Sequence, residues 1–201
     1  CVVSNAVGST TSATATLTVT ANGAPTANPQ TLVTPEDVAL PITLTGTDPE
    51  GEALTYAIVT APAQGTLSGS GASQSYTPAA NYSGADSFSF RVTDASGNPS
   101  APATVSITVT AVNDLPLASF TLTPDSGLAP LLVSVDATAS SDVEGPLASY
   151  AWAFGDAGTG TGATTTHTYT QAGPYTVTLT VTDGDGATAA STHPVTVRAN
   201  G

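Results

Sequence analysis

Apolar and polar residues alternate with a period of two along most of this chain. The alternation is clearest over residues 88–94, 105–109 and 175–182. No stretch shows the 3.6-residue period of an amphipathic helix. The runs end at clusters of turn-forming residues, such as those at 48–51, 96–99 and 183–186. Many short, half-buried strands separated by such turns predict an all-β fold of antiparallel sandwiches.

The chain also contains an internal repeat. Both copies carry an Asp eight residues before a Tyr, and later a Val-Thr-Asp triplet. These positions are Asp48, Tyr56 and 92–94 in the first copy, and Asp142, Tyr150 and 181–183 in the second. Final strands are expected at 103–111 and 194–199. We therefore predict two sandwiches, at residues 22–112 and 113–201, joined end to end and preceded by a separate segment at 1–21.

The charge balance excludes two classes of partner. Fifteen acidic residues against two basic ones, Arg91 and Arg198, give a formal net charge of −13. Such a chain repels nucleic acid and anionic lipid, and it has no apolar run of the roughly 20 residues that span a bilayer. The surface is rich in Thr and Ser, with only 8% charged residues and no lysine for an isopeptide crosslink. We expect an extracellular or cell-surface location, and a piece of a longer bacterial or archaeal protein.

The second copy resembles a PKD domain, a relative of the immunoglobulin sandwich. The resemblance is carried by YAWAFGD at 150–156, HTY at 167–169 and GPYTVTLTVTD at 173–183. Ala157 departs from the family, which usually continues with a second glycine. The resemblance implies an immunoglobulin-like sandwich over nearly the whole second copy.

The first copy looks like the cadherin-like tandem repeats of large bacterial surface proteins. Its motifs are PED at 35–37, GTDPEG at 46–51, GTL at 65–67, YTP at 76–78, YSGADSF at 82–88, VTD at 92–94 and VND at 112–114. Each motif is loose by itself, but together they span the copy. The resemblance implies a second sandwich of the same kind.

Residues 1–21 resemble the last two strands of an immunoglobulin-superfamily domain and predict a hairpin at 1–8 and 13–19. The resemblance implies that Cys1 is disulfide-bonded to an upstream residue, since one cysteine cannot form an internal disulfide. An isolated hairpin is marginally stable in water. We expect it to contact another chain or to be loose.

Carboxylates in turns predict a calcium site. A turn between early strands and a turn between the last two strands of a sandwich can lie at the same end, next to the incoming linker. Calcium takes six to eight oxygen ligands, and crowded carboxylates without a cation repel one another. The resemblance to cadherin-like modules implies calcium at module junctions, with Glu36 supplied by the upstream module. The predicted junction ligands are Glu36, Asn113, Asp114, Asp142, Glu144 and Asp183, and a weaker upper site has Asn22, Asp48, Glu50 and Asp94.

Acidic turn residues also occur simply because Asp and Asn side chains hydrogen-bond turns and stay solvated. This second interpretation applies to each acid taken singly. It is our expectation for Asp86, Asp125, Asp156 and Asp185.

Catalysis is not expected. The two histidines, His167 and His193, are interpreted as packing or hydrogen-bonding residues, and the inventory of His and Cys is too small for zinc. Trp152 is expected in the core, and Tyr169 or Tyr175 in a corner-tyrosine role. With so few aromatic residues, we expect most of them to be used in the cores.

The leading hypothesis is an extracellular structural or adhesive segment, in an adhesin, stalk, sheath or filament, whose serial sandwiches are rigidified by Ca²⁺. One alternative is a glycan- or polymer-binding accessory region of a secreted hydrolase. Another is a self-assembling filament subunit, in which residues 1–21 complete a sandwich in a neighbouring subunit by strand addition. The expected partners are therefore neighbouring modules or subunits and, under the accessory-module alternative, glycans, without nucleic acid or membrane insertion.

Overall fold

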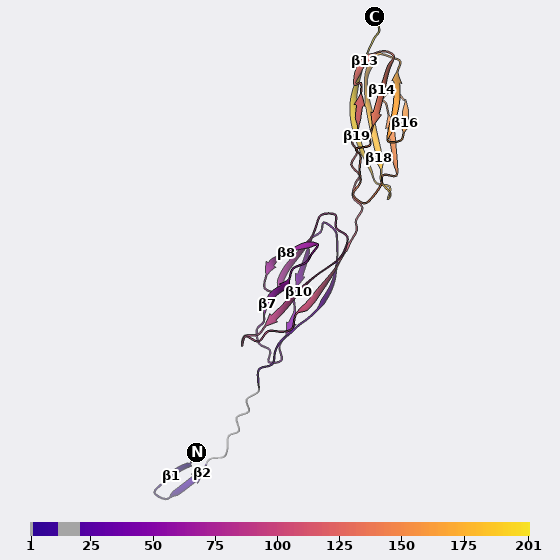
Figure 1. Cartoon of the computed structure of the whole chain (residues 1–201). Helices are drawn as coiled ribbons and strands as arrows, with labels where there is room; N and C mark the ends of the chain where they lie inside the picture. The colour runs from indigo at the N-terminus through magenta and orange to yellow at the C-terminus, as the bar shows by residue number, and fades with distance from the viewer. Residues whose placement is uncertain (1, 12–20) are drawn as a thin grey trace. The chain divides into compact units, whose positions relative to one another are not determined.

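The computed structural model describes residues 2–11 and 21–201, and every regular element in them is a β-strand (Figure 1). The all-β prediction is confirmed. The chain divides into two compact units, Cys1–Thr110 and Ala111–Gly201. No helix in the described residues is long and apolar enough to cross a membrane.

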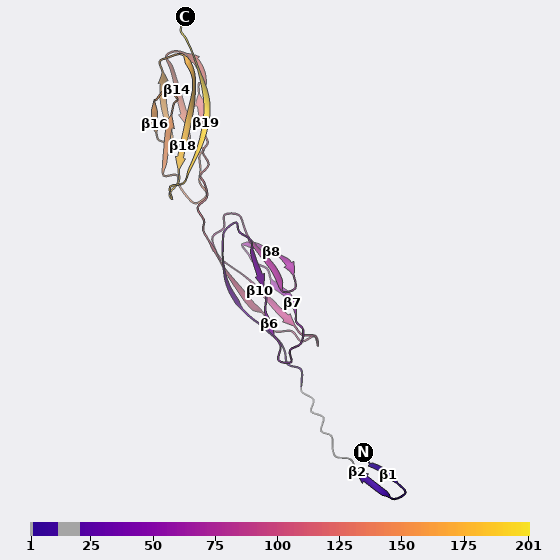
Figure 2. The ribbon, with the colours of Figure 1, turned by 180° about the vertical axis from the view of Figure 1, so that it is seen from behind.

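The first unit packs a four-stranded sheet, β4-β11-β10-β7, against a three-stranded sheet, β5-β9-β8, with a small β3-β6 ladder at one end (Figure 2). Alternate side chains of β10 and β11 point inward, and the buried cluster includes Tyr76, Phe88, Phe90, Val105 and Ile107. The strands are β1 (Val2–Asn5), β2 (Gly8–Thr11), β3 (Thr26–Ala27), β4 (Gln30–Pro35), β5 (Leu40–Thr43), β6 (Gly46–Thr47), β7 (Thr55–Thr60), β8 (Gly65–Ser70), β9 (Ser73–Pro78), β10 (Gly84–Thr93) and β11 (Ala103–Thr110).

The second unit packs a three-stranded sheet, β12-β14-β17, against a five-stranded sheet, β13-β19-β18-β15-β16. Its core holds Trp152, as expected, with the indole Nε1–H donating to the carbonyl oxygen of Gly162 over 2.9 Å. The strands are β12 (Thr121–Thr123), β13 (Ser126–Leu128), β14 (Leu131–Asp136), β15 (Ser149–Ala153), β16 (Thr159–Thr161), β17 (Thr164–Tyr169), β18 (Gly173–Thr182) and β19 (Thr188–Arg198).

Two strand pairs correct the expectation of purely antiparallel sheets. β4 runs parallel to β11, and β13 runs parallel to β19. In the second unit β12 belongs to the three-stranded sheet and β13 to the five-stranded sheet, and in the first unit β3 pairs with β6 whereas β4 pairs with β11. The crossings fall at Asn28-Pro29 and Pro124-Asp125, where proline removes a ladder donor and lets the chain change sheets.

The last strand of the second unit is longer than the sequence predicted, because it begins at Thr188 rather than Pro194. Proline is expected to start or interrupt a strand. Here the N–H of Thr196 donates to Asp125, on the β13 side of the strand. Residues two apart in a strand face the same side, so the nitrogen of Pro194 also points toward the β13 side. The pairing of β19 with β13 begins only at Thr196, so the missing N–H of Pro194 removes no hydrogen bond from either ladder.

The N-terminal hairpin turns earlier in the chain than predicted. β1 pairs with β2, which starts at Gly8, because the side chain of Asn5 accepts the N–H groups of Val7 and Gly8 and closes a tight turn. The predicted strand at 13–19 and the predicted disulfide of Cys1 lie outside the described residues. Val2 and Val3 are about two-thirds exposed, at 64% and 66%.

Candidate functional site

At one end of the first unit, the turn after β6 is organised by Asp48. Its Oδ1 accepts the backbone N–H groups of Glu50 (3.0 Å) and Glu52 (2.9 Å), an arrangement typical of Asx turns. Its other oxygen, Oδ2, is buried and has no hydrogen-bond partner among the described residues. A buried oxygen without a partner loses the energy of solvation unless a proton or a cation reaches it.

The linker that enters the first unit is tied to this same end. The side-chain amide of Asn22 donates to Asp94 Oδ2 over 2.9 Å, and the N–H of Gly23 donates to Glu50 Oε2 over 3.1 Å. Asp94 also accepts both the backbone and the side-chain N–H of Asn98. Burial alone would raise the pKa of Asp94, but these hydrogen bonds outweigh it and hold the pKa below its ordinary value.

The second unit repeats this arrangement at the equivalent positions. The amide of Asn113 donates to Asp183 Oδ2 over 2.9 Å, and the N–H of Asp114 donates to Glu144 Oε1 over 3.3 Å. Asp142, which corresponds to Asp48, likewise has one buried oxygen, Oδ1, without a partner in the described part of the chain. The internal repeat thus extends from sequence spacing to hydrogen bonds.

The two carboxylates that face the Asn113-Asp114 linker differ in electrostatics. Asp183 is only 1% exposed, and the amide of Asn113, together with the backbone N–H of Ala187, holds its pKa below the ordinary value against the effect of burial. Burial raises the pKa of Glu144, and the negative charges of Asp114 and Asp142 raise it further. The repulsion at Glu144 is the kind that a bound cation relieves.

Beside these groups lies a small hollow of ≈ 170 Å³ in the second unit. It is lined by Asp142, Glu144, Gly145, Pro146, Gly184 and Asp185. Asp185, interpreted from the sequence as a solvated turn residue, therefore lies at the candidate site. Asp185 lies two residues after Asp183 in the same turn, and this spacing could have placed it among the predicted ligands.

The donor chemistry fits a hard cation, but the described residues do not form a finished cage. Carboxylate and amide oxygens are the ligands that Ca²⁺ prefers. However, no three Asp, Glu, His or Cys side chains among the described residues are grouped closely enough to hold a metal ion. A cation would have to displace the amide N–H of Asn113 from Asp183. Turning that amide over would then present its oxygen in place of its nitrogen.

Glu36, the remaining predicted ligand, lies at the C-terminal end of β4 in the first unit. It is 5% exposed, and its backbone N–H donates to the carbonyl oxygen of Thr110 over 2.9 Å. Its participation in the junction site stays a prediction.

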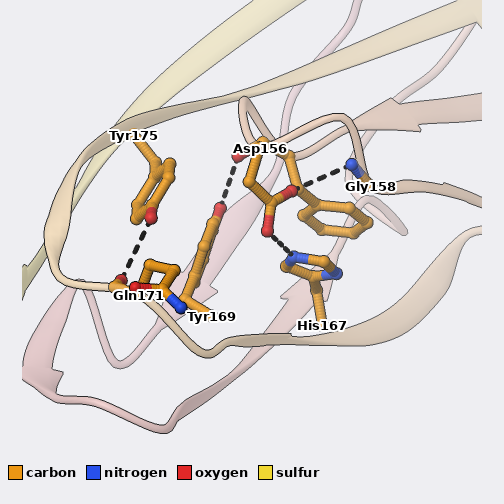
Figure 3. A network of polar contacts seen from close by, with 7 residues as sticks. Asp156, Gly158, His167, Tyr169, Gln171 and Tyr175 are labelled. Carbon is orange, nitrogen blue, oxygen red and sulfur yellow. Dashed lines mark hydrogen bonds and ion pairs between the residues drawn. The ribbon is translucent and has the colours of Figure 1, made fainter.

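A separate polar network in the second unit joins the turn after β15 to β17 (Figure 3). His167 Nε2 lies 2.8 Å from Asp156 Oδ2, and its ring stacks on Phe154 with centroids 4.2 Å apart. The hydroxyl of Tyr169 donates to the carbonyl oxygen of Phe154, and that of Tyr175 to Gln171. His167 thus both packs on Phe154 and hydrogen-bonds Asp156, as the sequence interpretation of this histidine expected, and we call the Asp156–His167 pair the clasp.

Comparisons with known proteins assign each unit. Residues 113–199 match the family model of the PKD domain, and residues 22–110 match that of the bacterial Ig domain. Both are non-catalytic, immunoglobulin-like domains. No curated protein matches the chain.

Several solved structures are similar to parts of this chain. The PKD1 domain of Vibrio anguillarum Epp is 40% identical and aligns over 44% of this chain and 100% of its own, with a TM-score of 0.39. A structure of carbohydrate-binding modules from the β-sandwich superfamily is 37% identical over 44% of this chain, with a TM-score of 0.42, and the match spans only 36% of that chain. PcdhgB3 EC1-4 is 11% identical over 91% of this chain and 52% of its own, with a TM-score of 0.54.

Proposed function

We propose an extracellular structural role for this chain, which belongs to the PKD domain family through residues 113–199 and carries a bacterial Ig domain at 22–110. The two modules form a segment of a larger surface or secreted protein, where they act as spacers or adhesive units. Calcium binds the acidic end of each module and stiffens the linker that enters it. The low content of charged side chains and the absence of lysine support an extracellular setting.

One observation carries the calcium part of the proposal. The equivalent aspartates Asp48 and Asp142 each have one buried oxygen without a partner among the described residues. At the same end of each module, an Asn side chain and a backbone N–H of the linker donate hydrogen bonds to two further carboxylates. Two modules with different sequences would hardly retain the same unsatisfied oxygen for packing alone, because such an atom destabilises a fold by about 1–3 kcal/mol. A bound cation would coordinate this oxygen and so replace the missing hydrogen bond.

The residues of the second module that would hold Ca²⁺ are Asp142, Glu144 and Asp183, with the Asn113 amide oxygen and Asp114. Glu36 is the further ligand that the sequence predicts. Binding would neutralise the repulsion at Glu144 and fix the linker residues to the turns. The physical effect is mechanical, since a linker held to its module loses hinge freedom.

Isothermal titration calorimetry of the chain with Ca²⁺ tests the proposal. The chain should release or absorb saturable heat, and at a hundredfold excess of calcium over Kd its stability should rise by about 2.7 kcal/mol. Asp142→Asn combined with Asp183→Asn should remove most of both effects. Asp125→Asn, an exposed acid outside the site, is the matched control and should change neither. A wild-type chain with neither heat nor a melting shift would rule out the calcium mechanism.

A further inference from the structure

A second hollow, unrelated to the acidic ends, opens in the bacterial Ig module. It has a volume of ≈ 500 Å³ and lies where the loop between β7 and β8 passes the first half of β10 and the second half of β11. This volume falls within the roughly 300–1,000 Å³ of small-molecule sites. Besides alanines and Ile107, the lining residues are Gln64, Tyr82, Asp86, Ser87, Ser106 and Thr108.

The walls of this hollow are held in place by buried hydrogen bonds. Asp86, 8% exposed, accepts the backbone N–H groups of Ala63 and Gln64, both at 3.0 Å, and the hydroxyl of Tyr76 at 2.8 Å. These bonds fix the β7–β8 loop to β10. A site whose walls are already ordered loses less entropy when a ligand binds.

The single aromatic ring of the hollow is fixed as well. The hydroxyl of Tyr82 donates to the carbonyl oxygen of Ala85 over 2.8 Å, and its backbone N–H donates to Ala79. Gly84 makes this possible, because a Cβ at that position would lie 2.9 Å from the Tyr82 hydroxyl oxygen, and its φ of +141° disfavours other residues. The ring is therefore a preformed wall.

The free polar groups of the hollow are all neutral. The side chains of Gln64, Ser87, Ser106 and Thr108 are exposed and make no hydrogen bond within the described residues. The one charged group, Asp86, has its oxygens occupied by four donors. No lining residue is basic, and the chain carries a net charge of −13, so anionic ligands are repelled.

We propose that this hollow binds one or two residues of a neutral glycan. A pyranose ring presents an apolar C–H face, which suits the ring of Tyr82, and a rim of hydroxyls, which both donate and accept. The Gln64 amide and the hydroxyls of Ser106 and Thr108 have that same dual capacity. An aromatic wall with a few convergent neutral polar groups is the composition expected of a specific small-ligand site.

The PKD module provides an internal comparison. A hollow of ≈ 390 Å³ lies over β12, β14 and β17. Its lining contains threonines, Ser134, Val135 and Asp136 but no aromatic ring. Without a ring to cover the apolar face of a sugar, this hollow does not bind the same ligands.

The test is a ¹H–¹⁵N NMR titration of the whole chain with cellobiose, maltose, chitobiose and mannobiose, and with digalacturonic acid as the anionic probe. All titrations are run in a calcium chelator, so that a failure of the calcium proposal does not affect the result. At least one neutral disaccharide should give saturable shifts confined to the backbone amides around the Tyr82 hollow. The anionic disaccharide should give none.

Two variants locate the binding. Ser106→Leu fills the hollow, and Gln64→Ala removes an amide; each should weaken binding at least about tenfold, roughly the loss expected for a blocked or unpaired polar contact. Thr104→Ala, an exposed residue on the same face of β11 and outside the hollow, should leave affinity unchanged. The proposal is overturned if no neutral disaccharide gives saturable shifts, if the shifts map elsewhere, or if Ser106→Leu binds like wild type.

Discussion

Asp86 shows how much of the bacterial Ig module depends on single buried side chains. Its carboxylate joins the β7–β8 loop, β9 and β10 through hydrogen bonds from Ala63, Gln64, Tyr76 and Ser87. Burial opposes ionisation, but the donors outweigh it and hold the pKa of Asp86 below the ordinary value. Correspondingly, burial and the nearby carboxylate raise the pKa of Tyr76 above its usual range.

Replacing Asp86 with Asn should destabilise the first module. An amide nitrogen would face backbone N–H groups that need an acceptor, so at least one buried donor would be left unpaired, which destabilises by about 1–3 kcal/mol. Tyr76→Phe removes one donor and leaves the carboxylate its other partners, so its effect should be smaller, about 1 kcal/mol. Urea unfolding followed by circular dichroism measures both. Equal losses in the two variants would contradict the central role of Asp86.

The clasp between Asp156 and His167 predicts a dependence on pH in the PKD module. Burial tends to raise the pKa of Asp156, but the hydrogen bonds from His167 and Gly158 lower it below the ordinary value. The folded pKa thus lies below the unfolded one, near 3.9. The stabilisation is present above the unfolded pKa and is lost as pH falls through the folded pKa.

His167→Phe preserves the ring stacked on Phe154 but removes the bond to Asp156. The variant should therefore lose less stability than wild type between about pH 5 and pH 2. Thermal melts of both proteins across that range, monitored by Trp152 fluorescence, give the comparison. Parallel pH profiles would show that the clasp does not contribute through ionisation.

These residue-scale features were only partly predictable from sequence. His167 was interpreted as a packing or hydrogen-bonding residue because of its place beside Tyr169, and it does both, although it lies in the middle of β17 and does not open a strand. The interpretation of Asp86 as a solvated turn acid was wrong: it is buried within β10, where its donors come mainly from residues 63, 64 and 76, distant in sequence. The buried oxygen of Asp142 was equally hidden, since burial of a single atom depends on the packing of the surrounding turns.

At the scale of elements, the two-residue alternation located most strands, because each sandwich buries one face of every sheet. The long strands β10, β11 and β18 fall where the alternation is most regular. Alternation does not encode strand direction, so the parallel pairs β4–β11 and β13–β19 could not be read from it. Nor does it reveal which side of β19 the nitrogen of Pro194 faces.

The turn after β15 depends on a glycine. Gly155 has φ of +83°, and a Cβ there would lie 2.8 Å from the carbonyl oxygen and 2.9 Å from the nitrogen of Thr176 in β18. Both atoms belong to the backbone of β18, which pairs with β19 at this residue, so they cannot move aside without disturbing that ladder. Gly155→Ala should destabilise the PKD module by about 1–3 kcal/mol.

Gly145 is the matched control, because an added Cβ would meet nothing within 4 Å and its φ is not positive. Gly145→Ala should change stability by less than about 0.5 kcal/mol. Guanidinium unfolding followed by Trp152 fluorescence compares the two variants with wild type. A Gly155→Ala protein as stable as Gly145→Ala would show that the turn can relax.

At the scale of the whole molecule, each module has its own buried cluster, and these share no residue. The tandem organisation was accessible from the sequence because both modules repeat the same Asp–Tyr and Val-Thr-Asp spacing. The candidate calcium ligands were predicted only as residue types in turns, since spacing shows that turns can share an end but not whether their oxygens are free. The hydrogen bonds from Asn22 and Asn113 to Asp94 and Asp183 could not be derived in that way.

The two modules should respond differently to calcium. The linker of the PKD module carries Asp114, whereas the bacterial Ig module has Gly23 at the equivalent position and therefore one carboxylate fewer. Fewer charged ligands weaken a calcium site. Trp152 is the only tryptophan of the chain and lies in the PKD core, so its fluorescence reports that module alone. At a hundredfold excess over Kd, calcium should raise the melting temperature seen by Trp152 on the order of 10 °C.

The melting transition of the bacterial Ig module, followed by scanning calorimetry, should shift less at the same calcium concentration. Asp114→Gly gives the PKD module the linker composition of its neighbour and should reduce the Trp152 shift to a similar size. The exposed acid Asp125, changed to Asn, should leave the shift intact. A larger shift in the bacterial Ig module, or an Asp114→Gly protein that responds like wild type, would show that the linker carboxylate does not set the strength of calcium binding.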